Sequence, residues 1–373
     1  MAPGPVSRAW VDVDLGALRR NAEALARRAA APLLPMVKSD AYGLGVGPVV
    51  EALEPLAPWG YGVATVEEGA ELRALGVRRP VVVFTPVLRE GLLAAREAEL
   101  TLALGDAALV REWAGGGGRW HLAIDTGMNR AGVSWREVGA LADVVAAFPP
   151  EGAFTHFHSA DRNDGSREEQ ERRFREALAL LPARPAILHA DNSPALERAG
   201  ASPWTVVRPG VFLYGVGSGA GAVLGPEPVA HLRARVVELR ELQDGDTVSY
   251  DATYRAVGAR RIATVAAGYA DGYRRALSNR GTALLNGRRA PVAGLVTMDM
   301  TMLDVTDVPC QVGDVATLIG RAGDDLLSLE AVARTADLSP YELLTGLRLR
   351  AARVYTSGSM AEGPARAAAG RGR

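Results

Sequence analysis

One lysine in this sequence carries chemistry that its many arginines cannot supply. Lys38 is the only lysine among 42 lysine and arginine residues, so the other 41 are arginines. Arginine stays protonated in proteins, whereas a lysine amine can lose its proton and form a Schiff base with an aldehyde. We expect a chain with this bias to keep a lysine where that chemistry is needed. The alternative is a surface lysine retained by chance.

Other polar side chains follow short apolar runs, as Lys38 does. The positions directly at the ends of such runs are Lys38, Asp125, His156, His189 and Arg208. With His158, three of the five histidines lie at or near these ends. A single histidine of this kind is more often a structural hydrogen-bonding group than a catalyst. Five polar residues at equivalent positions favour a shared site.

Eight apolar runs alternate with stretches of helical periodicity. The runs are residues 33–37, 61–65, 81–84, 100–104, 120–124, 153–156, 186–189 and 205–207. Eight strand–helix units are typical of a closed (β/α)8 barrel, with a doubly wound open sheet as the alternative. In such a barrel, catalytic residues lie at the carboxyl ends of the strands. The five polar residues from Lys38 to Arg208 are at these ends.

The pattern changes after residues 215–228, which are rich in glycine, alanine and proline. Alternating strands with turn signals follow. We therefore predict a barrel over residues 10–225 and a mostly β C-terminal domain over residues 226–356, joined by residues 1–9. Residues 357–373 are small and arginine-rich, which predicts a disordered tail.

The composition excludes several functional classes. A formal net charge of −1 argues against a general affinity for nucleic acid or anionic membranes. The single cysteine, Cys310, excludes an intramolecular disulfide and any multi-cysteine metal site, and we expect no metal. The first residues lack the apolar segment of a signal peptide, and no apolar run is long enough to span a bilayer. We expect a cytoplasmic protein.

The loops after the seventh and eighth runs predict a phosphate site. In (β/α)8 barrels these loops commonly bind phosphate. Here the first contains Ser193 and the second contains Gly210, where backbone N–H groups can approach an anion. A reactive lysine near a phosphate site is typical of enzymes that use pyridoxal 5′-phosphate.

The sequence resembles the alanine racemases, which are pyridoxal-phosphate enzymes built from a barrel and a β domain. The resemblance extends over roughly residues 8–355 and rests on motifs in the family order. These are VKSDAYG at 37–43, DTGMNR at 125–130, THF at 155–157, RPG at 208–210, VSY at 248–250, GYADG at 268–272, MD at 298–299 and RVY at 353–355.

The resemblance implies a role for each matching residue. Lys38 and Tyr250 would be the bases on opposite faces of the substrate, supported by His156, Arg208 and Arg130. The cofactor-binding residues would be Lys38, Tyr42, Ser193, Arg208, Gly210, Val211 and Tyr355. The substrate-binding residues would be Arg130, Met298 and Tyr269. Arg208 would also donate to the pyridine nitrogen of the cofactor.

Two further implications concern assembly and a departure from the family pattern. Family members are head-to-tail homodimers in which the β domain of one subunit completes the site of the other. Many also carry a carbamylated lysine two residues before the DTGM motif, which orients the arginine of that motif. This chain has Ala123 there. Another acid or a bound anion such as chloride would have to orient Arg130.

The implied activity is interconversion of L-alanine and D-alanine, which supplies D-alanine for peptidoglycan. A racemase acting on serine or basic amino acids is the first alternative. A non-catalytic pyridoxal-phosphate protein is disfavoured by Tyr250 and the second domain. A decarboxylase of the same fold is expected to place a carboxylate where this chain has Arg208.

Overall fold

Short parallel strands form the central sheet of the first of two units, Leu18–Glu227. The computed structural model describes residues 7–347 and 350–357. The strands of this sheet are β2 (Tyr61–Val63), β3 (Val81–Val83), β4 (Thr101–Leu104), β5 (Trp120–Asp125), β7 (Gly152–Phe154) and β8 (Ile187–His189). They pair in that order, and β6 (Val133–Ser134) pairs with the end of β5. Each main strand coincides with one predicted run.

Two further segments close the sheet into a barrel. The bridges that do so are Leu33–Val207, Met36–Gly62 and Asn192–Arg208. Pro35 and Pro209 lie in or beside these segments and have no N–H to donate, so pairing is limited to isolated bridges. The runs predicted as the first and eighth strands thus lie between β8 and β2. The (β/α)8 prediction is confirmed, and the doubly wound alternative is wrong.

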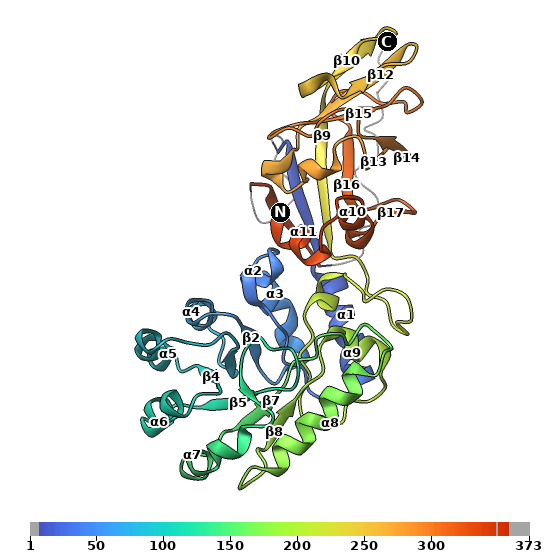
Figure 1. Ribbon diagram of the computed structural model, residues 1–373. Coiled ribbons are helices and arrows are strands. Elements are labelled where there is room, and N and C mark those ends of the chain that lie inside the picture. The colour runs from blue at the N-terminus through green and yellow to red at the C-terminus, as the bar shows by residue number, and fades with distance from the viewer. Residues whose placement is uncertain (1–6, 348–349, 358–373) are drawn as a thin grey trace. The chain divides into compact units, whose positions relative to one another are not determined.

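Helices alternate with the barrel strands in sequence and lie around the sheet in Figure 1. The helices are α1 (Leu15–Ala29), α2 (Lys38–Tyr42), α3 (Val46–Leu53), α4 (Val66–Ala74), α5 (Leu92–Glu97), α6 (Ala107–Gly115), α7 (Ala142–Ala147), α8 (Ser166–Ala179) and α9 (Ser193–Arg198). The strands are buried almost throughout, as expected for a parallel sheet covered on both faces.

The second unit joins Met1–Ala17 to Pro228–Arg373 and contains a nine-stranded, mostly antiparallel sheet. The main path runs β14-β13-β16-β9-β1-β18, with β12, β15 and β17 attached to it. The strands are β1 (Ala9–Asp14), β9 (Ala230–Leu242), β12 (Arg260–Val265), β13 (Thr282–Leu285), β14 (Arg288–Pro291), β15 (Thr301–Asp304), β16 (Val315–Ala322), β17 (Asp325–Leu327) and β18 (Ala352–Thr356). A separate pair, β10 (Thr247–Val248) and β11 (Tyr254–Arg255), and two helices, α10 (Leu329–Thr335) and α11 (Pro340–Gly346), complete the unit.

The N-terminal strand shows where the expected domain boundary differs from the structure. Strand β1 pairs with β9 and β18, so the boundary predicted at residue 10 falls inside a strand of the β sheet. All six residues of β1 are buried, so the Val–Asp alternation of its sequence does not correspond to one buried and one exposed face. No helix or strand is present between Tyr214 and Ala230, where the linker was expected. The tail predicted at 357–373 lies, from residue 358 on, outside the described residues.

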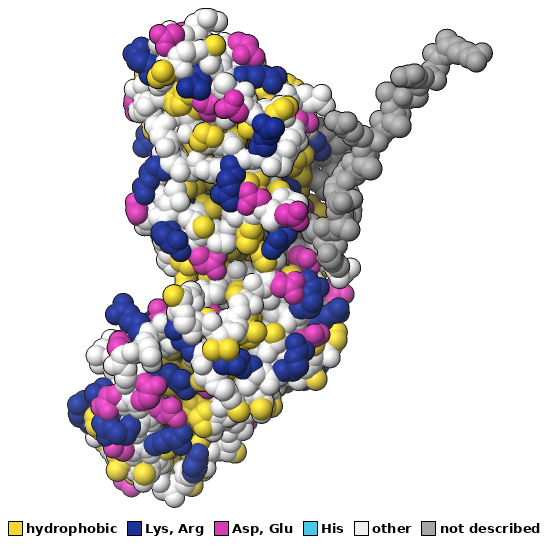
Figure 2. Space-filling model, turned by 90° about the vertical axis from the view of Figure 1, so that its right-hand side faces the viewer, with side chains coloured by type: hydrophobic (Ala, Val, Ile, Leu, Met, Phe, Trp, Pro, Cys, Tyr) yellow, Lys and Arg dark blue, Asp and Glu magenta, His cyan; other side chains and the backbone are white. Residues whose placement is uncertain are grey.

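The surface carries charges of both signs. On the face shown in Figure 2, dark blue and magenta side chains are interspersed rather than gathered by sign. Apart from Lys38, every blue side chain is an arginine. Within the described part of the chain, no helix combines the length and apolar character needed to cross a membrane.

Candidate active site

Lys38 begins a turn of unusual backbone conformation at the carboxyl end of the first barrel segment. The next four residues, Ser39, Asp40, Ala41 and Tyr42, all have φ between 53° and 57°. These values belong to the left-handed helical region, which costs a residue other than glycine about 1–2 kcal/mol. Such strain persists only where the surroundings enforce it, and it is concentrated at functional sites.

Local contacts hold this turn. The Asp40 carboxylate accepts a hydrogen bond from the Val46 N–H at 2.8 Å, and Glu68 accepts one from the Ser39 N–H at 2.7 Å. The Tyr42 ring stacks on Tyr214, with ring centroids 4.6 Å apart. The turn therefore fixes both the amine-bearing residue and the Tyr42 ring.

The surroundings of Lys38 favour the neutral amine. Burial lowers the pKa of Lys38, the positive charge of Arg130 lowers it further, and the carboxylate of Glu68 acts in the opposite direction. The net shift of the pKa is downward. The Lys38 amine therefore loses its proton at a lower pH than an exposed lysine would.

Arg130 lies on the loop that follows strand β5. Asp125, the last residue of β5, shapes this loop by accepting hydrogen bonds from the N–H groups of Gly127 and Asn129 at 2.8 and 3.1 Å. Arg130 is exposed, and no hydrogen bond or ion pair of its guanidinium is found among residues 7–347 and 350–357. The position of Arg130 relative to Lys38 is thus determined by the loop after β5 and not by an ion pair with a carboxylate.

Arg208 is buried at the end of the eighth barrel segment, with 3% of its surface exposed. Its Nη1 donates to Nδ1 and O of His189, and its Nη2 donates to the carbonyl oxygens of Thr155 and Ala190. A further contact of 3.4 Å joins Nη2 to Nδ1 of His156. No acceptor for Nε is found among the described residues, which leaves one N–H of the five for another group. Burial lowers the pKa of Arg208 to about 9, so it remains a cation at neutral pH.

Two histidines extend this network into the barrel. Because a guanidinium can only donate, Nδ1 of His189 must accept from Arg208. A neutral His189 then carries its proton on Nε2 and donates it to Nδ1 of His121, 2.8 Å away. The proton of His121 lies on Nε2, which is buried and has no partner in the described structure. Burial and the charge of Arg208 hold the pKa of both rings well below the usual range, to about 3 for His121, so both are neutral.

His156 is neutral for the same reasons. Burial lowers its pKa to about 3, assisted by the positive charges of Arg208, Arg130 and Lys38. Its backbone is held by Gln170, whose Nε2 donates to the His156 carbonyl at 3.1 Å. The ring therefore keeps one donor and one acceptor nitrogen.

A candidate anion-binding cradle lies between the seventh and eighth loops. The Ser193 hydroxyl accepts from the N–H groups of Gly210 and Phe212, at 2.8 and 3.4 Å. A Cβ added to Gly210 would lie 2.6 Å from the Tyr42 phenol oxygen, closer than any real Cβ contact. Val211, the next residue, begins a 3-10 turn and is buried. Hydroxyl and backbone N–H groups are the ligands that phosphate prefers at such loops.

The remaining predicted residues belong to the second unit. Tyr250 and Met298 are exposed, at 70% and 52%, and Tyr269 is exposed at 36%. Tyr355 lies on β18, paired with Val13 of β1.

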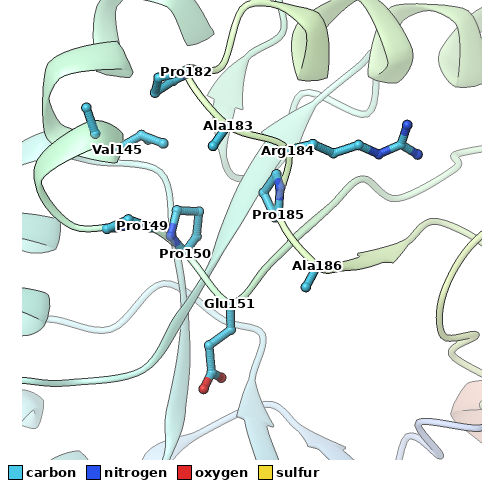
Figure 3. A pocket seen from close by; sticks show the side chains of 10 residues that line it. Val145, Pro149, Pro150, Glu151, Pro182, Ala183, Arg184, Pro185 and Ala186 are labelled. Atoms are coloured by element: carbon cyan, nitrogen blue, oxygen red, sulfur yellow. The ribbon is translucent and has the colours of Figure 1, made fainter.

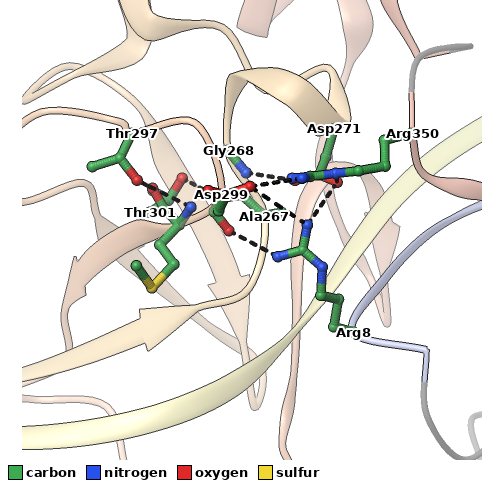
Figure 4. A network of polar contacts seen from close by, with 9 residues as sticks. Arg8, Ala267, Gly268, Asp271, Thr297, Asp299, Thr301 and Arg350 are labelled. Atoms are coloured by element: carbon green, nitrogen blue, oxygen red, sulfur yellow. Dashed lines mark hydrogen bonds and ion pairs between the residues drawn. The ribbon is translucent and has the colours of Figure 1, made fainter.

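A polar network holds the loops that bear Tyr269 and Met298. Buried Asp271 accepts from Arg350 at 2.9 and 2.8 Å and from Arg8 at 3.4 Å, and it also accepts from the Gly268 N–H. Arg350 reaches across to Asp299 at 2.7 Å. Figure 4 shows both arginines converging on the two aspartates. Backbone bonds from Tyr269 to Thr297 and from Ala270 to Met298 join the same loops.

A pocket of about 350 Å³ lies elsewhere on the barrel unit. Figure 3 shows its lining, which includes Pro150, Glu151, Pro185 and Ala186. Glu151 and Ala186 directly precede strands β7 and β8, so the pocket is at the amino ends of the strands. It contains none of the predicted site residues.

The structure brings together eight of the predicted residues at the carboxyl ends of the barrel strands. They are Lys38, Tyr42, Arg130, His156, Ser193, Arg208, Gly210 and Val211. Sequence reasoning did not include three polar residues that hold them: Glu68, His121 and Gln170. For Glu68 a signal was available, since Thr65 and Glu68 have the spacing of a helix capping box.

Comparison with known proteins identifies the family. The model of the alanine racemase N-terminal domain matches residues 13–218, and that of the alanine racemase C-terminal domain matches residues 229–355. The curated alanine racemase of Symbiobacterium thermophilum is 40% identical over 369 residues, covering 93% of this chain and 96% of the relative.

Solved structures agree in fold over nearly the whole length. The alanine racemase of Streptomyces lavendulae has a TM-score of 0.88 at 31% identity, covering 94% of this chain and 98% of that one. The alanine racemase of Bartonella henselae, described with covalently bound pyridoxal phosphate, has a TM-score of 0.87 at 27% identity, covering 94% of this chain and all of that one. Matched by both domain models over residues 13–218 and 229–355, this chain belongs to the alanine racemase family of pyridoxal-phosphate-dependent isomerases.

Proposed function

We propose that this protein interconverts L-alanine and D-alanine, with Lys38 and Tyr250 as the two bases. The observation that carries the proposal is the meeting of Lys38, buried Arg208 and the Ser193–Gly210 cradle at one end of the barrel. Family membership supports the substrate. The proposal includes a cytoplasmic location, as expected from the sequence, and a supply of D-alanine for peptidoglycan, as the family resemblance implies.

The residues present fit pyridoxal 5′-phosphate. The phosphate would be held by Ser193, the N–H groups around Gly210 and Val211, and the Tyr42 hydroxyl, with Tyr355 as a further contact. The backbone at Gly210 approaches the Tyr42 hydroxyl so closely that the space between them exists only because glycine has no Cβ. Arg208 has one N–H, on Nε, to offer the pyridine nitrogen. When bound, the cofactor supplies an aldehyde for an amine and a conjugated ring that withdraws electrons from the substrate Cα.

Lys38 would bind the cofactor and then move a proton at the substrate Cα. Its lowered pKa supports both tasks, because only the neutral amine can form a covalent link or accept a proton. Racemisation requires removal of a proton on one face and its return on the other. By the family resemblance, Lys38 would act on the face from which the D-isomer loses its proton.

Tyr250 would act on the opposite face, assisted by His156. A free tyrosine has a pKa of about 10, so it needs a donor that stabilises its ionised form. Arg208 donates to Nδ1 of His156, which places the ring proton on Nε2 and makes that nitrogen a donor. A neutral His156 facing Tyr250 would thus favour the phenolate. Arg208 cannot readily give up its proton, so it would bind the pyridine nitrogen without protonating it, which favours quick return of the Cα proton over side reactions.

A second copy of the chain would supply Tyr250, Tyr269 and Met298. The exposure of these side chains supports a head-to-tail homodimer in which each β domain completes the other copy's barrel site. Met298 would bind the substrate carboxylate through its N–H, and Tyr269 would line the entrance.

Arg130 would bind the substrate carboxylate or the phenolic oxygen of the cofactor. Ala123 offers no negative charge to orient it, and we find no carboxylate in contact with it in the described residues. A bound anion such as chloride, or the substrate itself, would take that place. The consequence would be an arginine ordered mainly on ligand binding.

Incubation with single L-amino acids in heavy water tests the proposal. We expect racemisation of alanine with deuterium at Cα, and much slower racemisation of serine and arginine. The Tyr250→Phe variant should retain cofactor binding yet lose turnover from L-alanine. Exchange of the Cα proton without inversion in the wild type would show that a single base works and would overturn the two-base assignment. Equal rates with serine or arginine would instead support the broad-specificity alternative.

A further inference from the structure

The Glu68 carboxylate joins three segments that meet beside Lys38. Its Oε1 accepts a hydrogen bond from the Ser39 N–H at 2.7 Å, and its Oε2 accepts one from the Ala64 N–H at 2.7 Å. Ser39 directly follows Lys38, whereas Ala64 directly follows strand β2. Glu68 itself is in the first turn of helix α4.

These contacts go beyond helix capping. In a capping box the glutamate bonds the N–H of the N-cap residue, which is Thr65 here. That bond is the longest of the three, at 3.4 Å, whereas the two bonds to Ser39 and Ala64 are 0.7 Å shorter. The two shortest contacts of the carboxylate thus hold the residue that follows Lys38 and the residue that follows β2.

We propose that Glu68 is a positioning residue for Lys38. Ser39 is the first residue of the left-handed turn, and Glu68 ties its N–H to the end of strand β2. This contact fixes the backbone position from which the Lys38 side chain extends. The inference rests on the proposed function of Lys38 as the cofactor-binding lysine. The residue before Lys38 is held by a different contact, since the Val37 N–H donates to the Gly62 carbonyl at 2.9 Å. The residue after Lys38 is held by Glu68.

A carboxylate is required because both oxygens accept. Glutamine has nearly the same shape, but one oxygen is replaced by an NH2 group that can only donate. Glu68→Gln would place this NH2 against an N–H of Ser39 or Ala64. Aspartate keeps both acceptors and the charge but is one methylene shorter, so it cannot span both N–H groups. Glu68→Gln therefore removes the charge at constant side-chain length, whereas Glu68→Asp shortens the side chain at constant charge.

The charge of Glu68 also faces the lysine amine. The charged and titratable groups acting on Lys38 are Arg130, which lowers its pKa, Glu68, which raises it, and His156, which is neutral. Loss of the Glu68 charge leaves Arg130 unopposed. Glu68→Gln should therefore shift the titration of Lys38 to lower pH, and Glu68→Asp should not.

The single lysine makes this titration directly measurable. Trinitrobenzenesulfonate reacts with unprotonated amines, and in the cofactor-free chain Lys38 is the only ε-amine. Peptide mass analysis distinguishes its adduct from one at the chain's amino terminus. The rate of labelling against pH would be compared for the wild type, Glu68→Gln, Glu68→Asp and Glu67→Gln. Glu67 is the matched control, since it is the exposed neighbour on the same helix turn.

Affinity for pyridoxal 5′-phosphate is the second measurement, by titration of the same cofactor-free proteins. We expect both Glu68 variants to bind about tenfold more weakly, the effect of losing one hydrogen bond to a charged group. Glu67→Gln should match the wild type in affinity and in labelling. The midpoint of labelling should fall only in Glu68→Gln.

Three results would overturn the inference: unchanged affinity in both Glu68 variants, an equal loss in Glu67→Gln, or a labelling midpoint that rises in Glu68→Gln. If Glu68→Gln does not fold, Glu68→Asp alone decides through its affinity. Failure of the proposed function is distinguishable, because a wild type that borohydride does not link to the cofactor at Lys38 would reject that function whatever the Glu68 variants do.

Discussion

Arg208 shows how a single cation can be kept inside the barrel. Its guanidinium is enclosed by carbonyl oxygens and by the neutral rings of His156 and His189, with His121 behind His189. Protonation of any of these rings would bury a second positive charge next to the first. Arg208 therefore determines which nitrogen of each histidine ring carries the proton. The packing around Arg208 requires all three rings to be neutral.

This arrangement predicts acid sensitivity of the cofactor-free protein. The pKa values of His121 and His156 are lowered to about 3, whereas unfolded histidines titrate near 6.5. Between these values the unfolded chain binds more protons, so the free energy of unfolding should fall as pH drops from 6.5 towards 3. Urea denaturation at a series of pH values measures this. His121→Phe should flatten the dependence and exposed His158→Gln should not; an unchanged slope in His121→Phe would contradict the assignment.

Lys38→Arg tests the chemistry of the lone lysine with its charge retained. Arginine stays protonated and cannot link covalently to the cofactor aldehyde. We expect no visible absorbance band of bound pyridoxal phosphate and no racemase activity, while thermal unfolding of the cofactor-free protein changes by only a few degrees. A variant that still shows the band would contradict the assignment, because the cofactor would then be held without Lys38 and the chain has no other lysine to link it.

Arg208→Lys tests the guanidinium as a multiple donor. A lysine ammonium is a point charge that cannot make the four internal bonds and still offer Nε–H. Removal of such a preorganised donor typically costs a factor of about 10²–10³ in kcat. We expect a loss of this size with a smaller change in KM. An equal loss in Arg162→Lys, on an exposed loop, would show that the assay is reporting general instability.

At the scale of elements, the left-handed turn and the loop at Gly210 form the cradle between them. The turn delivers the Tyr42 ring, and the loop must pass it closely enough that no Cβ fits. A Cβ at Gly210 would lie 2.6 Å from the Tyr42 phenol oxygen, so this position requires space beside that ring. Substitution here therefore probes contact with Tyr42 directly.

Gly210→Ala should weaken pyridoxal phosphate binding by about tenfold, because its Cβ would displace the Tyr42 phenol. In a Tyr42→Phe background the same substitution meets no phenol oxygen and should cost much less. Affinities of the wild type, both single variants and the double variant form the necessary cycle. Strictly additive losses would show that the two residues do not share the cradle.

The sequence predicted these elements unevenly. Six of the eight runs became regular strands, because continuous Val, Ile and Leu segments are characteristic of buried parallel strands. The first and eighth became bridges, because Pro35 and Pro209 interrupt pairing, an effect that depends on which neighbour lies alongside. Strand ends carried Lys38 and Arg208 as expected. The roles of Glu68 and His121 could not be predicted, since each depends on a partner far away in sequence, Ser39 and His189 respectively.

At the scale of the whole molecule, the proposed site is divided between the barrel and the exposed residues of a second copy. Tyr250 and Met298 are exposed, and Met300 and Val257, exposed at 43% and 73%, are further apolar side chains of the β domain that face solvent. The Asp271 network already rigidifies the loops bearing Tyr269 and Met298. A preformed and uncovered surface of this kind is expected to be completed by association.

Mixing two inactive variants tests that division. In a head-to-tail dimer, Lys38→Ala and Tyr250→Phe subunits that reassociate at random should restore about one quarter of wild-type activity, because half the dimers are mixed and each has one intact site. If both bases came from the same chain, every site would keep one defect. An inactive mixture, with subunit exchange verified by mass, would therefore reject the shared site.

The lone lysine has a consequence for how this protein ages. Simple reducing sugars modify proteins mainly at amines, and every other lysine or arginine position here is an arginine. The exterior is thus largely inert to that damage, whereas each such event at Lys38 inactivates a catalytic centre. Bound cofactor would then protect Lys38 from modification as well as activate the enzyme. The rate of inactivation by a reducing sugar would therefore follow the fraction of subunits that have lost their cofactor.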